Sequence, residues 1–216
     1  MKVVQTPLPV EQYYPQPQKK QQIVLHHTVS NPLSAQGDVD YWMSDTPRIA
    51  TAYIIAYDGT INRCFPSSNW AHHLGVRVAE IKAMGFKDFM TRNEVLNRNS
   101  IGIELDSWGG LTKTTKGFVN AYGKLINPTL EVIEYNWRGY KYYQKYSDAQ
   151  IQALKELLTE LMKRYSIPSY GIKNGDFNQL PDAIGGKPGI YSHSSYRRDK
   201  SDLYPDERII KMLNSL

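Results

Sequence analysis

Residues 22–28 read Gln-Ile-Val-Leu-His-His-Thr, a short apolar run that ends in two histidines and a hydroxyl group. A run of Ile, Val and Leu bounded by polar residues predicts a buried strand. Side chains at the end of such a strand face the cleft that the sheet forms, and neutral imidazole is the commonest ligand of zinc. His193 and Asp202, near the C-terminus, are candidates for further ligands. We therefore expect these distant segments to meet at one metal ion.

The two adjacent histidines are not equivalent, because successive side chains of a strand point to opposite faces of the sheet. Normally only one of the pair reaches a metal on a given face. We take His26 as the ligand and expect His27 to pack or hydrogen-bond behind it.

Composition describes a globular protein that can bury a core. The chain has 216 residues, of which 41% are hydrophobic and 22% are charged. Its single cysteine, Cys64, excludes an intramolecular disulfide framework. The net charge of +5 suits an anionic partner, such as a cell-wall polymer or a nucleic acid, but chooses neither. The same charge fits a solvated surface equally well.

Targeting signals are not evident in the sequence. Residues 1–7 lack the charged start and the apolar stretch of a signal peptide, and no run of about 18 apolar residues predicts a membrane span. We therefore expect synthesis in the cytoplasm, and if the protein acts outside the cell, another factor must release or deliver it.

Composition also divides the chain into an arm and a body. Residues 1–20 are rich in Pro, Gln and Lys and predict an extended N-terminal arm. Residues 21–216 are expected to form a single domain with a tyrosine-rich excursion at about 107–147. The tyrosines of the excursion fit either packing within a sheet or a platform on which sugars stack.

Two hairpins and one long helix are the clearest predicted elements. Asp58-Gly59 predicts a hairpin with a type I′ turn, which needs positive φ at both central residues. The excursion begins with a polar loop after Gly109-Gly110 and continues as a second hairpin around Arg138-Gly139. Ser147 and Gln150 form a capping-box signature before a helix that Pro168 closes. The other expected elements are short helices at 34–43 and from about 206, a helix or loop insertion at 76–97 and a strand at 100–105. A long loop is expected at 169–188, followed by a segment at 189–192 that leads into His193.

Glu104 stands inside an otherwise apolar strand. An unpaired buried carboxylate is costly, so this position predicts a partner or a functional site. Catalytic zinc sites typically have three protein ligands and a water, whose proton a nearby carboxylate accepts. His26, His193 and Asp202 fit the three ligands, and Glu104 fits the acid–base role. Lys200 fits a group that stabilises the oxyanion.

Each of these residues taken alone has a structural explanation as well. A histidine at a strand end is more often a structural residue than a ligand, and no local His-x-x-x-His or Cys-x-x-Cys motif is present.

Five segments in a fixed order resemble the zinc-dependent N-acetylmuramoyl-L-alanine amidases, the family of phage lysozyme-type amidases and peptidoglycan recognition proteins. They span nearly the whole chain and lie at 23–28 (IVLHHT), 53–60, 71–75, 99–105 (NSIGIEL) and 193–202. The resemblance implies an α/β fold with a central mixed sheet of about five or six strands. Helices would flank this sheet, and the zinc site would lie at one edge of a surface groove.

The resemblance also implies an activity and a role for each motif residue. The activity is hydrolysis of the amide between N-acetylmuramic acid and L-alanine in peptidoglycan, by a lytic enzyme such as a phage endolysin. The implied site has Zn²⁺ held by His26, His193 and Asp202, catalysis by Glu104 and Lys200, and substrate binding by His73 and Asn99.

The chain departs from the family pattern around the last two ligands. Ser192 replaces the usual glycine before the second histidine, and Leu203 follows Asp202 where the family has a Pro-Gly pair. Thr51 stands where some relatives have a tyrosine, so Glu104 would act alone.

Two other function classes remain open. A non-catalytic peptidoglycan-binding module of the same fold would keep the groove without a complete ligand set. A nucleic-acid-binding protein would account for the charge and the tyrosines, but no basic cluster is denser than Arg197-Arg198.

Overall fold

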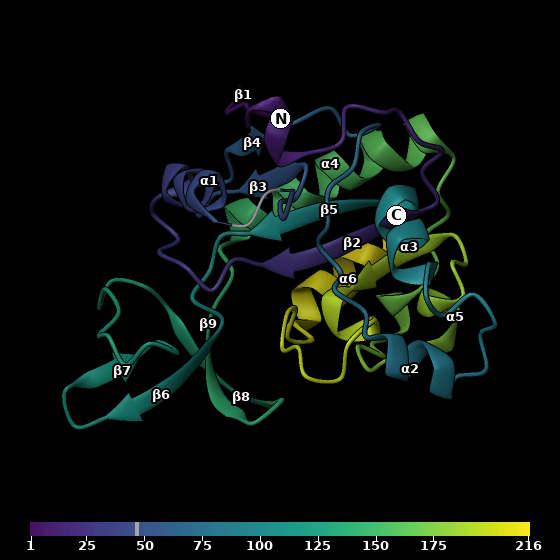
Figure 1. Cartoon of the computed structure of the whole chain (residues 1–216). Helices are drawn as coiled ribbons and strands as arrows, with labels where there is room; N and C mark the ends of the chain where they lie inside the picture. Colours follow the sequence, from purple (N-terminus) through teal and green to yellow (C-terminus); the bar gives the residue numbers. More distant parts are fainter. Residues whose placement is uncertain (46–47) are drawn as a thin grey trace.

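The centre of the computed structural model, which describes residues 1–45 and 48–216, is a six-stranded mixed sheet (Figure 1). In sheet order the strands are β1 (Val3–Gln5), β4 (Ile61–Arg63), β3 (Tyr53–Ile55), β5 (Ser100–Leu105), β2 (Gln22–His27) and β10 (Gly189–Ser192). β2 lies between β5 and β10 and is parallel to both, while β3 is parallel to β5 and antiparallel to β4. The expected α/β fold with five or six central strands is therefore confirmed.

Helices pack on both faces of this sheet. They are α1 (Ala35–Ser44), α2 (Val78–Ala83), α3 (Arg92–Asn99), α4 (Asp148–Tyr165), α5 (Pro181–Ile184) and α6 (Glu207–Asn214). Ile23 and Leu25 of β2 belong to a buried cluster with residues of α4 and α6, whereas Val24 packs with residues of α2, α3 and α5. Among the described residues, none of these helices is long and apolar enough to cross a membrane.

The capping box at the start of α4 is confirmed. Ser147 Oγ accepts the Gln150 N–H, and Gln150 Oε1 accepts the Ser147 N–H. The Gln150 amide is fully buried and also donates to the carbonyls of Ile55 and Asp106. The cap therefore ties α4 to the ends of β3 and β5.

The excursion forms a second sheet that projects from the body at the lower left of Figure 1. The second hairpin is confirmed, but the polar loop expected after Gly109-Gly110 is wrong because β6 and β7 occupy it. Gly110 is needed there, since a Cβ atom would lie 2.3 Å from the ring of Tyr140. The strand order is β7-β6-β9-β8, with β6 (Gly110–Thr114), β7 (Gly117–Val119), β8 (Val132–Trp137) and β9 (Tyr140–Gln144).

The two hairpin turns differ from each other. Arg138 and Gly139 both have positive φ, 47° and 85°, as a type I′ turn requires. In the first hairpin only Gly59 does, so the type I′ turn expected there is wrong. The Asp58 side chain accepts from the backbone and hydroxyl of Thr60 and holds a different turn.

The tyrosines of the second hairpin mainly pack within the protein. Tyr143 and Tyr146 are fully buried, and both rings lie 4.7 Å from the ring of Tyr204. This favours sheet packing over a sugar-stacking platform for these two residues.

Several shorter expectations are also settled. The helix at 34–43 is α1, and residues 76–97 form α2 and most of α3, separated by Gly85 at φ 83°. The loop expected at 169–188 contains α5 and a short 3-10 turn, Ile172–Asn174. The N-terminal residues lie against the body, where the Tyr14 ring stacks on Trp70 at 3.8 Å.

Candidate metal centre and cleft

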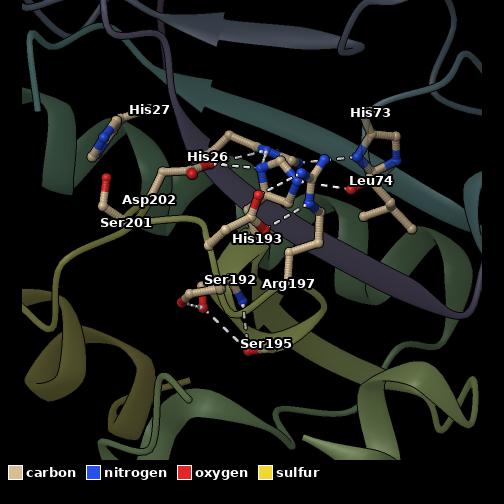
Figure 2. A network of polar contacts seen from close by, with 12 residues as sticks. His26, His27, His73, Leu74, Ser192, His193, Ser195, Arg197, Ser201 and Asp202 are labelled. Atoms are coloured by element: carbon tan, nitrogen blue, oxygen red, sulfur yellow. Dashed lines mark hydrogen bonds and ion pairs between the residues drawn. The ribbon is translucent and has the colours of Figure 1, made fainter. Parts of the chain in front are cut away.

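His26, His193 and Asp202 converge at the carboxyl ends of β2 and β10 (Figure 2). The His26 Nδ1 atom lies 3.1 Å from His193 Nδ1, and Asp202 Oδ2 lies 2.9 Å from His193 Nδ1 and 3.3 Å from His26 Nδ1. All three residues are buried. The structure therefore brings the three expected ligands to one point.

The sheet explains how residues so far apart in sequence meet. Parallel pairing places Leu25 of β2 beside Ser192, the last residue of β10, so His193 follows the end of β10 next to His26 of β2. His26 shares the face of Val24, while His27 points the other way and its Nδ1 lies 2.8 Å from the Tyr146 hydroxyl. His27 is thus the second histidine that hydrogen-bonds behind the site.

The position of the ring proton of His193 follows from its partner. Its Nε2 atom lies 2.9 Å from the carbonyl oxygen of Leu74, which can only accept. Nε2 therefore carries the proton in the neutral ring, and Nδ1 presents a lone pair to the site.

The ring proton of His26 is set by a longer chain of contacts. Ser100 Oγ lies 2.7 Å from the Leu96 carbonyl and donates to it, so it accepts from His73 Nε2 at 2.8 Å. His73 Nδ1 is then the acceptor for His26 Nε2 at 3.0 Å. His26 Nδ1 is left without a proton. We call His26, His73, Ser100 and Leu96 the histidine relay.

This donor set fits a metal ion. Two imidazole lone pairs and a carboxylate oxygen face one another within 3.3 Å, with no proton between the two nitrogens. Burial, followed by the charge of His193, lowers the pKa of His26 to about 4, so this ring is neutral at pH 7. Burial alone would raise the pKa of Asp202, but the two histidines hold it well below its usual range. Imidazole nitrogens and an ionised carboxylate are ligands that zinc accepts.

The metal centre lies in a cleft of about 230 Å³ that Glu104, Lys200 and His73 also line. Glu104 lies directly beside His26 in the pairing of β5 with β2. Within the described residues the Oε2 atom of Glu104 is buried without a hydrogen-bond partner, and burial, followed by the charge of Asp202, raises the pKa of Glu104 well above the usual value. A carboxylate held in this way is suited to accept a proton.

The structure does not bring every expected site residue into the cleft. Asn99 ends α3 and precedes β5, so it lies at the opposite end of that strand from Glu104. His73 lines the cleft, but both of its ring nitrogens are engaged by His26 and Ser100.

Sequence reasoning missed two supporting features of the site. Ser100 has a signal in the alternation of residues 100–105, where Ser100, Gly102 and Glu104 share the face opposite the buried Ile and Leu side chains. The role of the excursion has no local signal. Trp137 Nε1 donates to the Ser201 carbonyl at 3.1 Å, which braces the loop that carries Asp202.

A mixed α/β sheet with a buried His-His-Asp site beside a free carboxylate is the arrangement of a metal-dependent hydrolase. The profile of the Amidase_2 family, described as N-acetylmuramoyl-L-alanine amidase, matches residues 16–205. The chain therefore belongs to this family, whose enzymes cleave peptidoglycan.

Solved structures with a similar fold include PlyL and two endolysins. PlyL has 13% identity, with 99% of this chain and 97% of that chain covered and a TM-score of 0.53. The endolysin amidase LysCS from Clostridium intestinale has 17% identity, with 99% of this chain and 95% of that chain covered and a TM-score of 0.52. A mutant endolysin from Bacillus subtilis has 15% identity, with 100% of this chain and 96% of that chain covered and a TM-score of 0.52. At these identities the likeness concerns the fold. No curated protein matches the sequence.

Proposed function

We propose that this amidase uses zinc bound by His26, His193 and Asp202, with Glu104 as the acid–base group. The observation that carries the proposal is the convergence of three candidate ligand atoms in the cleft that Glu104 lines, where Glu104 Oε2 has no hydrogen-bond partner among the described residues. The scissile bond is the amide between the lactyl group of N-acetylmuramic acid and L-alanine.

The residues of the chain have separate tasks in this reaction. When bound, zinc polarises the amide carbonyl and makes a water molecule acidic. Glu104 takes the proton of the attacking water and returns it to the nitrogen of the departing L-alanine. Lys200, in the same cleft, places a positive charge near the oxyanion. Asp202 keeps a structural task, because its Oδ2 belongs to the ligand set.

The non-catalytic binding module is less consistent with this site. Such a module needs the groove but not a full ligand set, nor a carboxylate buried without a partner. Here both are present in one cleft.

The test is Glu104→Gln, assayed for release of new amino groups from cell walls and from soluble muropeptides, together with zinc content. Loss of the proton acceptor should lower the rate by about 100-fold or more, with one zinc still bound per chain. Glu94→Gln, at an exposed position on α3, is the matched control and should keep full activity.

Two outcomes would contradict the proposal. A Glu104→Gln variant with normal activity would remove Glu104 from the mechanism. Wild-type protein that binds peptidoglycan, but binds no zinc and hydrolyses no amide, would favour the binding module.

A further inference from the structure

A second and larger cavity adjoins the metal cleft. Its volume is about 790 Å³, and Thr28 and Val29 line both spaces, so the two lie next to each other. Its walls come from α1 and from the excursion, which lie on the same side of the body in Figure 1. Any group bound in this cavity is therefore next to the reaction centre.

One polar group in the wall is buried without a partner. Asn120 is 4% exposed, and its Oδ1 accepts the backbone N–H groups of Tyr122 and Lys124, each at 3.0 Å. Its Nδ2 is buried and makes no hydrogen bond within the described part of the chain. A buried amide donor in this state is costly, which points to an acceptor that the protein itself does not supply.

The charge that faces the cavity is positive. Lys124 is exposed, and no acidic group pairs with it among residues 1–45 and 48–216. Asp38, the other charged residue of the wall, is turned inward. Its carboxyl shares a hydrogen bond with Asp106, to which Ser30 Oγ also donates at 3.3 Å. The cavity therefore presents donors and a cation.

Two aromatic rings from different elements also line this cavity. Tyr41 of α1 is 62% exposed and Tyr122 of the excursion is 70% exposed. Large exposed rings at a polar cavity mark a contact surface, because they cover apolar atoms of a ligand at little entropic cost.

We propose that this cavity is the subsite for the stem peptide, and that Lys124 Nζ and Asn120 Nδ2 bind a free carboxylate of that peptide. The inference rests on the proposed function. The glycan is neutral once the lactyl carboxyl is in the scissile amide, whereas the peptide side carries free carboxylates. A cation and an unpaired donor therefore select the peptide over the sugar.

The test compares two soluble muropeptides, one with free stem-peptide carboxylates and one with these groups as amides. Lys124→Met removes the charge and keeps the length of the side chain. Asn120→Asp keeps the oxygen that the turn needs but replaces the donor by a carboxylate. Both variants should raise KM about tenfold for the acid substrate, with kcat unchanged, and leave the amide substrate unaffected. Lys116→Met, in the exposed turn between β6 and β7, is the control and should change neither.

Other outcomes would overturn the inference. An equal change for both substrates, or none, would exclude carboxylate recognition. A change that follows glycan length instead would assign the cavity to sugars.

Direct binding separates this inference from the proposed mechanism. Calorimetry with the free stem peptide needs no catalysis, so binding that is lost in both variants would support the subsite even if Glu104 had no role. Normal hydrolysis by a protein whose affinity for that peptide is the same in all variants would overturn the subsite alone.

Discussion

Replacing Ser100 by alanine is expected to weaken metal binding without altering a ligand. The Ser100 hydroxyl is buried, accepts from His73 Nε2 at 2.8 Å and donates to the Leu96 carbonyl at 2.7 Å. Without it, the His73 ring loses the acceptor that sets its tautomer. His26 Nδ1 is then no longer held as a lone pair directed at the metal.

The magnitude follows from the hydrogen bonds that the substitution removes. A buried donor left unpaired costs about 1–3 kcal/mol. Partners of this kind behind metal ligands typically change affinity by about 10–100-fold. We expect Ser100→Ala to bind zinc about tenfold more weakly and to lose about 1–2 kcal/mol of unfolding free energy.

The assay is competition for zinc against a chelator of known affinity, with urea unfolding in parallel. Ser67→Ala is the matched control, because its hydroxyl is also in a buried residue and bonds to the Tyr165 hydroxyl at 2.8 Å, outside the cleft. The control should lose stability but not zinc affinity. Unchanged zinc affinity in a folded Ser100→Ala variant would refute the relay.

Three further outcomes are expected. Trp137→Phe removes the donor to the Ser201 carbonyl and should weaken zinc binding severalfold in the same competition assay, whereas unchanged binding would show that the excursion does not brace the ligand loop. Burial raises the pKa of Asp38 to about 6 and that of Asp106 to about 8, so the native state holds extra protons above pH 4 and stability falls as pH rises toward 8. Asp38→Asn should flatten this fall in urea unfolding and stabilise the protein by roughly 1–3 kcal/mol at pH 8, and an unchanged slope would count against a shared proton. Chelation should lower the melting temperature, since three lone pairs then face one another; an identical melt with and without chelator would argue against a metal at this site.

Local sequence patterns predict several elements of the fold. The apolar run in residues 22–28 predicts a buried strand, and the alternation in residues 100–105 predicts a strand with Glu104 on the face opposite its Ile and Leu side chains. The capping box at Ser147 predicts the start of α4, because its two hydrogen bonds form within four residues. These features depend on neighbours in sequence, so the sequence is sufficient for them.

Weakly patterned elements were not predictable in the same way. β6 ends in three exposed polar residues and β7 has only three residues, Gly-Phe-Val, so neither strand carries an extended apolar alternation. The turn at Asp58-Gly59 follows the side-chain bonds to Thr60 instead of the expected φ angles.

The sequence by itself identified the three candidate ligands and Glu104, and only the tertiary structure decided which other residues join the site and how they act together. His26, His193 and Asp202 can be named from motif positions, and their meeting was confirmed. The relay through His73 was not predictable, nor was the Asn120 Nδ2 donor, which makes no hydrogen bond among the described residues. The reason is physical: ring-proton positions and unpaired donors depend on partners brought together by strand register and packing, not by spacing along the chain.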